Sequence, residues 1–167
     1  SGMGDGRFNP DASVTRAELA ALAIRALGLA GTNDVAPFGD VKSGNWFASS
    51  VATAKAYGLV SGYEDGNFRP ADTITRQEAA VIFARMMQLA GMDMAVSEEE
   101  ADSLLSGFAD GTATASWARL ATAALIKQGI VVGSEGRLHM ADEITRAETA
   151  VILSRLLQQA GLIDKQD

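Results

Sequence analysis

The sequence predicts an all-α fold in which tandem helical repeats close into a pseudo-threefold (three-pronged) domain around a central helix bundle. The first observation is a tetrapeptide, Thr-Arg-x-Glu, whose three copies start 60 and 70 residues apart: Thr15–Glu18, Thr75–Glu78 and Thr145–Glu148. The second is the Ala-, Leu- and Ile-rich segment that follows each copy at the spacing of one helix face. A single helix pair of this size cannot bury its apolar faces. Three copies can either stack linearly or close around an axis, and we expect closure.

Each tetrapeptide has the form of a capping box, in which Thr is the N-cap and Glu at N3 reaches back to the N-cap amide. This predicts helices over residues 16–27, 76–89 and 146–159. A glycine is the natural stop of each: Gly28, Gly91 and Gly161.

Two further helices are predicted over Trp46–Tyr57 and Trp117–Gln128, rich in small alanines that allow close packing. Between them and the last motif, Ser97 and Glu100 have the spacing of another capping box, opening a short helix to about Leu105.

The repeat boundaries follow from alignment of the chain with itself. Residues 1–10 match residues 61–70 at a constant shift of 60. We therefore expect repeats at 1–31, 32–91 and 92–167, with the first reduced to its C-terminal half because the chain starts inside it.

Composition excludes several functional classes. A net charge of −7 argues against a nucleic-acid partner, and the absence of cysteine excludes disulfides and thiol chemistry. No apolar stretch is long enough to span a bilayer. The loop around Gly66 resembles a calcium loop, but Ser61 and Tyr63 stand where carboxylates are needed. No catalytic or nucleotide motif is present, so we expect no cofactor, no metal and no enzyme activity.

Arg16, Arg76 and Arg146 each occupy the first turn of a predicted helix, where a cation opposes the helix dipole by about 0.3–1 kcal/mol. One interpretation is an anion site, in which unsatisfied N1–N3 amides and the guanidinium converge on a carboxylate or phosphate. The other is a structural salt bridge. We favour the anion site.

Trp46 and Trp117 have two interpretations of equal weight: core packing, or a platform on which a sugar ring stacks. Gly62 and Gly133 are predicted to supply positive φ or a close backbone approach, which a ligand can use.

Other recurrent polar residues receive structural interpretations. The acidic residues before each Trp helix are expected to cap turns: Asp40 and Asp110. Three arginines recur ten residues after each cap threonine and are expected to be solvated or to form intramolecular pairs: Arg25, Arg85 and Arg155. His139 is the only histidine, and no partner pattern supports a catalytic role.

The combined pattern of residues 35–91 is Phe-x-Asp, Trp, Gly-Tyr-x-Asp-Gly-x-Phe-x-Pro and Ile-Thr-Arg-x-Glu. It resembles the S-layer homology domain, which occurs as three tandem copies. The third copy departs from the pattern at Leu138 and Met140.

The resemblance implies an extracellular, non-catalytic anchor of the bacterial cell wall and S-layer. It implies that inter-repeat grooves bind an anionic secondary cell wall polymer, with pyruvate-ketal sugars as the expected ligand. The motif arginines Arg16, Arg76 and Arg146 would meet the acidic group, with Trp46, Trp117, Gly62 and Gly133 as groove neighbours. Two alternatives remain open: a protein–protein assembly module of the S-layer, completed by another chain or an upstream segment, and an envelope hydrolase that uses acidic residues.

Overall fold

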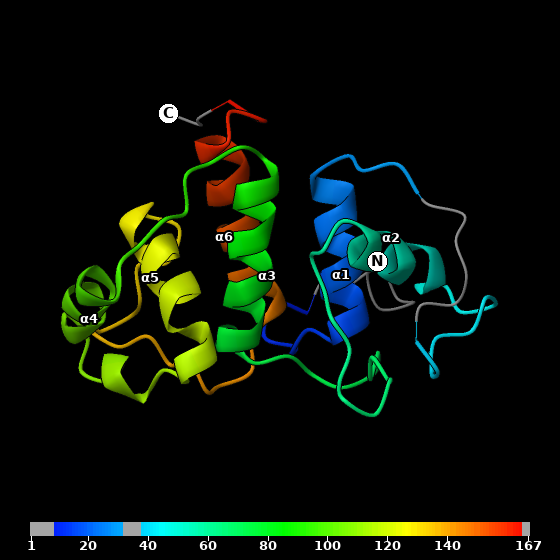
Figure 1. The fold of residues 1–167 in the computed structure, drawn as a ribbon, viewed down its shortest axis with the longest axis horizontal. Helices are drawn as coiled ribbons and strands as arrows, with labels where there is room; N and C mark the ends of the chain where they lie inside the picture. Colours follow the sequence, from blue (N-terminus) through cyan, green and yellow to red (C-terminus); the bar gives the residue numbers. More distant parts are fainter. Residues whose placement is uncertain (1–8, 32–37, 165–167) are drawn as a thin grey trace.

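The computed structural model describes residues 9–31 and 38–164 (Figure 1). It contains six α-helices in these ranges: α1 (Arg16–Ala26), α2 (Ala48–Ala56), α3 (Arg76–Leu89), α4 (Glu98–Ser106), α5 (Arg119–Lys127) and α6 (Arg146–Gln159). Two 3-10 turns, η1 (Gly111–Ala113) and η2 (Ser116–Ala118), precede α5. Only isolated β-bridges, and no β-strands, occur in the described ranges, which confirms the all-α prediction.

The three motif helices begin where the capping boxes predict. In each, the cap threonine hydroxyl accepts from the N3 amide, and the N3 glutamate accepts from the amide of the threonine. The helices α1, α3 and α6 end within one residue of the predicted ends at residues 27, 89 and 159, and the glycines that follow adopt left-handed φ values of 62° to 84°. Local chemistry therefore sets both ends of these helices.

Backbone contacts join the three motifs in a closed ring. Val14 N–H donates to the carbonyl of Ile144, Ile144 N–H to that of Ile74, and Ile74 N–H to that of Val14, each at 3.0 Å. These isoleucines and the valine stand at the same motif position and are buried. The ring closes the chain on itself, as closure rather than linear stacking requires.

A carboxylate links the same three motifs at a second position. Glu143 accepts hydrogen bonds from the hydroxyl groups of Ser13, at 2.5 Å, and Thr73, at 2.6 Å. These hydrogen bonds lower the pKa of Glu143, because they favour its charged form. Equivalent residues of the three motifs thus meet at one place, while the three-pronged shape of the whole domain stays a prediction.

The Trp-headed helices begin later than predicted. Helix α2 starts at Ala48 and α5 at Arg119, and neither has a side-chain cap. Trp46 lies in a turn and Trp117 in η2. Helix α2 packs against α1, and α5 packs against α3 and α4. In Figure 1 the motif helices stand in the middle, with α2 beside α1 and with α4 and α5 at the opposite end.

The core lies between these helices and under the loops. It includes Phe68, which stacks on Phe38 with ring centroids 5.2 Å apart, and Phe83, Met86 and Met87 of α3. No helix in the described part of the chain is both long and apolar enough to cross a bilayer.

Two predictions were incomplete or stay untested. Ser97 caps α4 by accepting from the Glu100 amide, but the Glu100 carboxylate pairs with Lys127 at 2.9 Å instead of returning to the cap. The repeat boundaries at 31/32 and 91/92 stay predictions, and the loop of the first repeat, residues 1–8, lies outside the described residues.

Candidate functional site

The amides that begin the motif helices are occupied by neighbouring repeats. At N1, Arg16, Arg76 and Arg146 each donate a backbone hydrogen bond of 2.9 Å to the carbonyl of Asp72, Asp142 and Ala12, respectively. The N2 amides likewise donate to the carbonyls of Pro70, Met140 and Pro10, and the N3 amides to the cap threonines. The prediction of unsatisfied N1–N3 amides is therefore wrong. The acceptors of the N1 and N2 amides lie 53 to 137 residues away in sequence, beyond the reach of a local motif.

The motif arginines pair with the N3 glutamates of other motifs. Arg16 pairs with Glu78 at 3.4 Å, Arg76 pairs with Glu148, and Arg146 pairs with Glu18 at 2.5 Å. Each pair links one motif to the next, and the last returns to the first. The structure thus contains the structural salt bridges that were the alternative interpretation. A contact between these arginines and a ligand stays a prediction.

The pair between Arg76 and Glu148 shows how the charges of the three ion pairs compensate one another. Burial raises the pKa of Glu148, but the backbone hydrogen bond from Thr145 and the charge of Arg76 outweigh it, so the pKa lies below its usual value. Each N3 glutamate caps its own helix and also pairs with the arginine of another motif. The ion pair with that glutamate offsets the electrostatic cost of placing the arginine near a helix N-terminus.

Arg16 is the most enclosed of the three, with 9% of its surface exposed. Its guanidinium donates to the carbonyls of Phe68, at 2.8 Å, and Ser61, at 3.2 Å, besides pairing with Glu78. It also lies 4.8 Å from the ring centroids of Tyr63 and Phe68. Its nitrogen atoms are engaged by the protein, so Arg16 holds the glycine loop of the second repeat.

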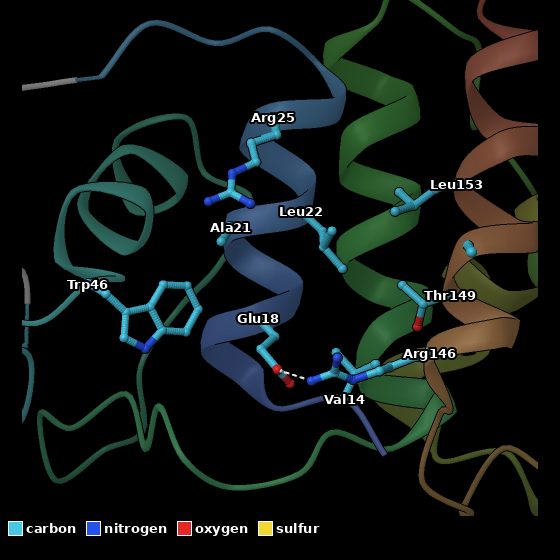
Figure 2. Close-up of a pocket in the computed structure, with 10 residues that line it drawn as sticks. Val14, Glu18, Ala21, Leu22, Arg25, Trp46, Arg146, Thr149 and Leu153 are labelled. Atoms are coloured by element: carbon cyan, nitrogen blue, oxygen red, sulfur yellow. Dashed lines mark hydrogen bonds and ion pairs between the residues drawn. The ribbon is translucent and has the colours of Figure 1, made fainter. Parts of the chain in front are cut away.

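Arg146 lies instead beside an open groove of about 230 Å³ between α1 and α6 (Figure 2). Residues of α1 at helical spacing form its floor: Glu18, Ala21, Leu22 and Arg25. Trp46 flanks α1 on one side, while Arg146, Thr149 and Leu153 of α6 lie on the other. The groove therefore draws on all three predicted repeats.

Trp46 and Trp117 are both exposed, at 62% and 58% of their surfaces. The interpretation of either residue as core packing is therefore excluded. Trp46 is held edge-on against Phe47, with ring centroids 5.4 Å apart. An exposed indole fixed beside a groove can stack on an apolar ring while its N–H donates a hydrogen bond.

Gly62 and Gly133 make the predicted close approaches, but toward the protein. A Cβ on Gly62 would lie 2.5 Å from the ring of Phe38, and one on Gly133 would lie 2.7 Å from the ring of Phe108. Gly133 also has a φ of +69°. The two glycines admit an aromatic ring against the loop backbone, and contact of either with a ligand stays a prediction.

Asp40 and Asp110 have a structural role, although the prediction of their partners was wrong. Asp110 accepts from the amides of Leu138, at 2.7 Å, and His139, at 2.8 Å, and Asp40 accepts in the same way from residues 68 and 69. Burial raises the pKa of Asp110, but these backbone hydrogen bonds outweigh it and hold the pKa below its usual value. Each carboxylate fixes a glycine loop nearly thirty residues downstream rather than a turn before the Trp helix.

His139 lies 3.5 Å from Asp142 in a surface loop, where its φ is +53°. Within the described ranges, no cluster of three histidine or acidic side chains has the geometry to hold a metal ion.

Sequence reasoning assigned no site role to Arg25 and Glu18, which both line the groove. The capping-box pattern predicts Glu18 as a helix cap, which it is, whereas its second role depends on a contact 128 residues away. Arg25 recurs with Arg85 and Arg155 at the same position after each cap threonine, and this recurrence is the sequence feature that could have indicated a role for it.

Comparison with known proteins gives the family. The model of the S-layer homology domain matches residues 1–20 and 37–80. The chain therefore contains sequence of the S-layer homology domain family. It is 35% identical over 164 residues to an amylopullulanase of Thermoanaerobacterium thermosulfurigenes, which covers 97% of this chain and 8% of that protein.

Two other relatives are named for the cell surface. The chain is 32% identical over 170 residues to the surface-layer 125 kDa protein of Lysinibacillus sphaericus, covering 99% of this chain and 14% of that protein. It is 28% identical over 166 residues to a cellulosome-anchoring protein of Acetivibrio thermocellus, covering 96% of this chain and 36% of that protein. The chain thus spans a minor part of the length of each of these relatives.

Proposed function

We propose that this S-layer homology chain is a non-catalytic, extracellular anchoring module that attaches a surface protein to the bacterial cell wall. The relatives named for a surface layer and for cellulosome anchoring support this role. The amylopullulanase shares only 8% of its length with the chain, so its enzyme name carries little weight for this module.

The observation that carries the proposal is the groove between α1 and α6, which the exposed indole of Trp46 lines together with two arginines. Its lining charges are Glu18, Arg25 and Arg146, one negative and two positive, so the groove is locally cationic on a chain of net charge −7. A local cationic patch is what an anionic polymer requires on an acidic protein.

The proposed ligand is an acidic glycopolymer, with a pyruvylated sugar as the specific candidate. A sugar ring stacks on Trp46, and its acidic substituent is drawn to the groove arginines. Among the motif arginines, Arg146 is the one that lines this groove, and we propose it as the motif arginine that contacts the ligand here. Arg16 and Arg76, with Trp117, Gly62 and Gly133, are proposed to shape the corresponding inter-repeat surfaces.

Co-sedimentation with purified cell walls tests this proposal. We expect the wild-type chain to pellet with the walls, and to do so less after ketal-linked pyruvate is removed chemically. Trp46→Ala should reduce pelleting, because it deletes the stacking surface. Leu162→Ala removes a side chain of similar exposure, 52%, outside the residues that line the groove and serves as the control.

Two further arms sharpen the result. EDTA should leave pelleting unchanged, since the proposed contacts of Trp46 and the groove arginines involve no metal. Equal pelleting of wild type and Trp46→Ala would refute the assignment of the groove. Failure of the wild type to pellet would refute wall binding itself.

A second candidate function, assembly with another protein chain, is favoured by one surface of α6. Val151 is 48% exposed, whereas Ala21 and Val81, at the same position of α1 and α3, are buried and half-buried. Helix α2 packs on α1 and α5 packs on α3, and a helix from another chain could cover α6 in the same way. Light scattering that shows a monomer at all concentrations would count against this function.

A further inference from the structure

Arg25, Arg85 and Arg155 occupy the same position in the three motif helices, but their surroundings differ. Arg85 donates to the carbonyl of Leu59 at 3.2 Å, and Arg155 donates to that of Ile130 at 3.3 Å. Both carbonyls lie just after the Trp-headed helix of the same predicted repeat. These two arginines therefore tie the ends of α2 and α5 to the motif helix that follows.

Arg25 has no such tie within residues 9–31 and 38–164, where no hydrogen bond or ion pair engages its guanidinium. It is exposed and lines the groove. In Figure 2 the guanidinium lies on the same side of α1 as Trp46, with Ala21 next to it. Among the described residues, Arg25 is thus the member of this set without an internal bond, and it lies on the side of α1 that carries the stacking surface.

The other cation of the groove is already balanced. Arg146 pairs with Glu18 at 2.5 Å, seven residues before Arg25 on α1. Seven residues of helix correspond to about 10 Å along the axis, so Arg25 lies well beyond this ion pair. The positive charge that a bound anion would meet is therefore concentrated at the Arg25 end.

We infer that Arg25 is the residue that selects an acidic sugar in this groove, by pairing with a carboxylate on a ring that stacks on Trp46. This inference rests on the proposed function and deepens it. A planar guanidinium pairs with a carboxylate through two parallel hydrogen bonds. The apolar side chain of Ala21 lies next to Arg25 in the groove lining, which suits an anion carried on carbon better than a phosphate.

Calorimetry with three small probes tests the inference. The first is a methyl hexopyranoside with a 1-carboxyethylidene ketal, the second is its methyl ester, and the third is a methyl hexopyranoside phosphate. The acid and the ester differ in one charge, so their affinity ratio measures recognition of that charge. A hydrogen-bonded charge pair corresponds to about a ten- to hundredfold preference for the acid in the wild type.

Arg25→Gln should abolish this preference and bring binding of the acid down to that of the ester. Arg85→Gln is the matched control: it changes the same helix position in α3, where the guanidinium binds Leu59, and should keep the preference while lowering the melting temperature. Circular dichroism verifies that both variants are folded.

Retention of the preference by folded Arg25→Gln would overturn the inference while leaving wall binding intact. A wild type that pellets with walls but binds acid and ester equally would also overturn it. A wild-type preference for the phosphate over the acid would overturn the carboxylate assignment. If the wild type binds neither walls nor any probe, the proposed function fails and this inference fails with it.

Discussion

Arg16→Ala tests whether a motif arginine holds two repeats together. The guanidinium donates to the carbonyls of Phe68 and Ser61 and pairs with Glu78, and its residue is 9% exposed. Alanine leaves two carbonyls and one carboxylate without this donor. The loop that carries Phe68 then loses its attachment to α1.

The expected loss follows from the burial of the two partners. Removing one member of a buried ion pair costs about 3–5 kcal/mol. The Glu78 side chain is 26% exposed, so water partly solvates its charge in the variant and the lower end, about 3 kcal/mol, is expected. For a chain of this size, that corresponds to a melting temperature lower by about 6–12 °C.

Urea unfolding followed by circular dichroism gives the free energy of unfolding. The control is Lys127→Ala, which breaks the exposed pair between Lys127 and Glu100 and should cost less than about 1 kcal/mol. If Arg16→Ala costs no more than this control, the contacts of Arg16 do not join the repeats and the reasoning is refuted.

Three other changes probe the loops and the capping glutamates. Asp110→Asn leaves one of two loop amides without its carboxylate acceptor and should cost about 1–3 kcal/mol by urea unfolding, and an unchanged value would mean that the loop does not depend on it. Gly62→Ala puts a carbon 2.5 Å from the Phe38 ring and should cost about 1–3 kcal/mol, while Gly44→Ala, whose added carbon meets no atom within 4 Å, serves as its control and should cost clearly less. The folded-state pKa of Glu148 is lowered, so its contribution to stability is complete above the unfolded pKa of about 4.3 and is lost as the pH falls through the folded value. Stability should therefore fall below about pH 5, and less steeply in Glu148→Gln; equal slopes would contradict this.

The sequence predicted the motif helices closely because their ends depend on nearby residues. Cap threonine, N3 glutamate and the terminal glycine lie within the segment that they define, so their spacing carries the information. The Trp-headed helices have no side-chain cap, and the pattern gave them a start two residues too early. Without a cap, only tertiary packing determines where such a helix begins.

The candidate site was less predictable because its contacts span the whole chain. The spacing that locates Arg146 at a helix start cannot show that Glu18, 128 residues away, neutralises it. The same holds for the N1 and N2 amides of the motif helices. The sequence predicts that they are unsatisfied, whereas in the structure they donate to carbonyls that precede the other motifs. The exposure of Trp46 was equally undetermined, since a turn before α2 rather than the helix itself carries the indole.

The most direct measurement follows the indole N–H signals of Trp46 and Trp117 by NMR while purified wall glycan is added. The chain has two tryptophans, so Trp46→Phe assigns both signals. We predict that the Trp46 signal shifts and saturates with glycan concentration. A Trp46 signal that stays in place, while the same protein sediments with walls, would contradict binding in the groove between α1 and α6.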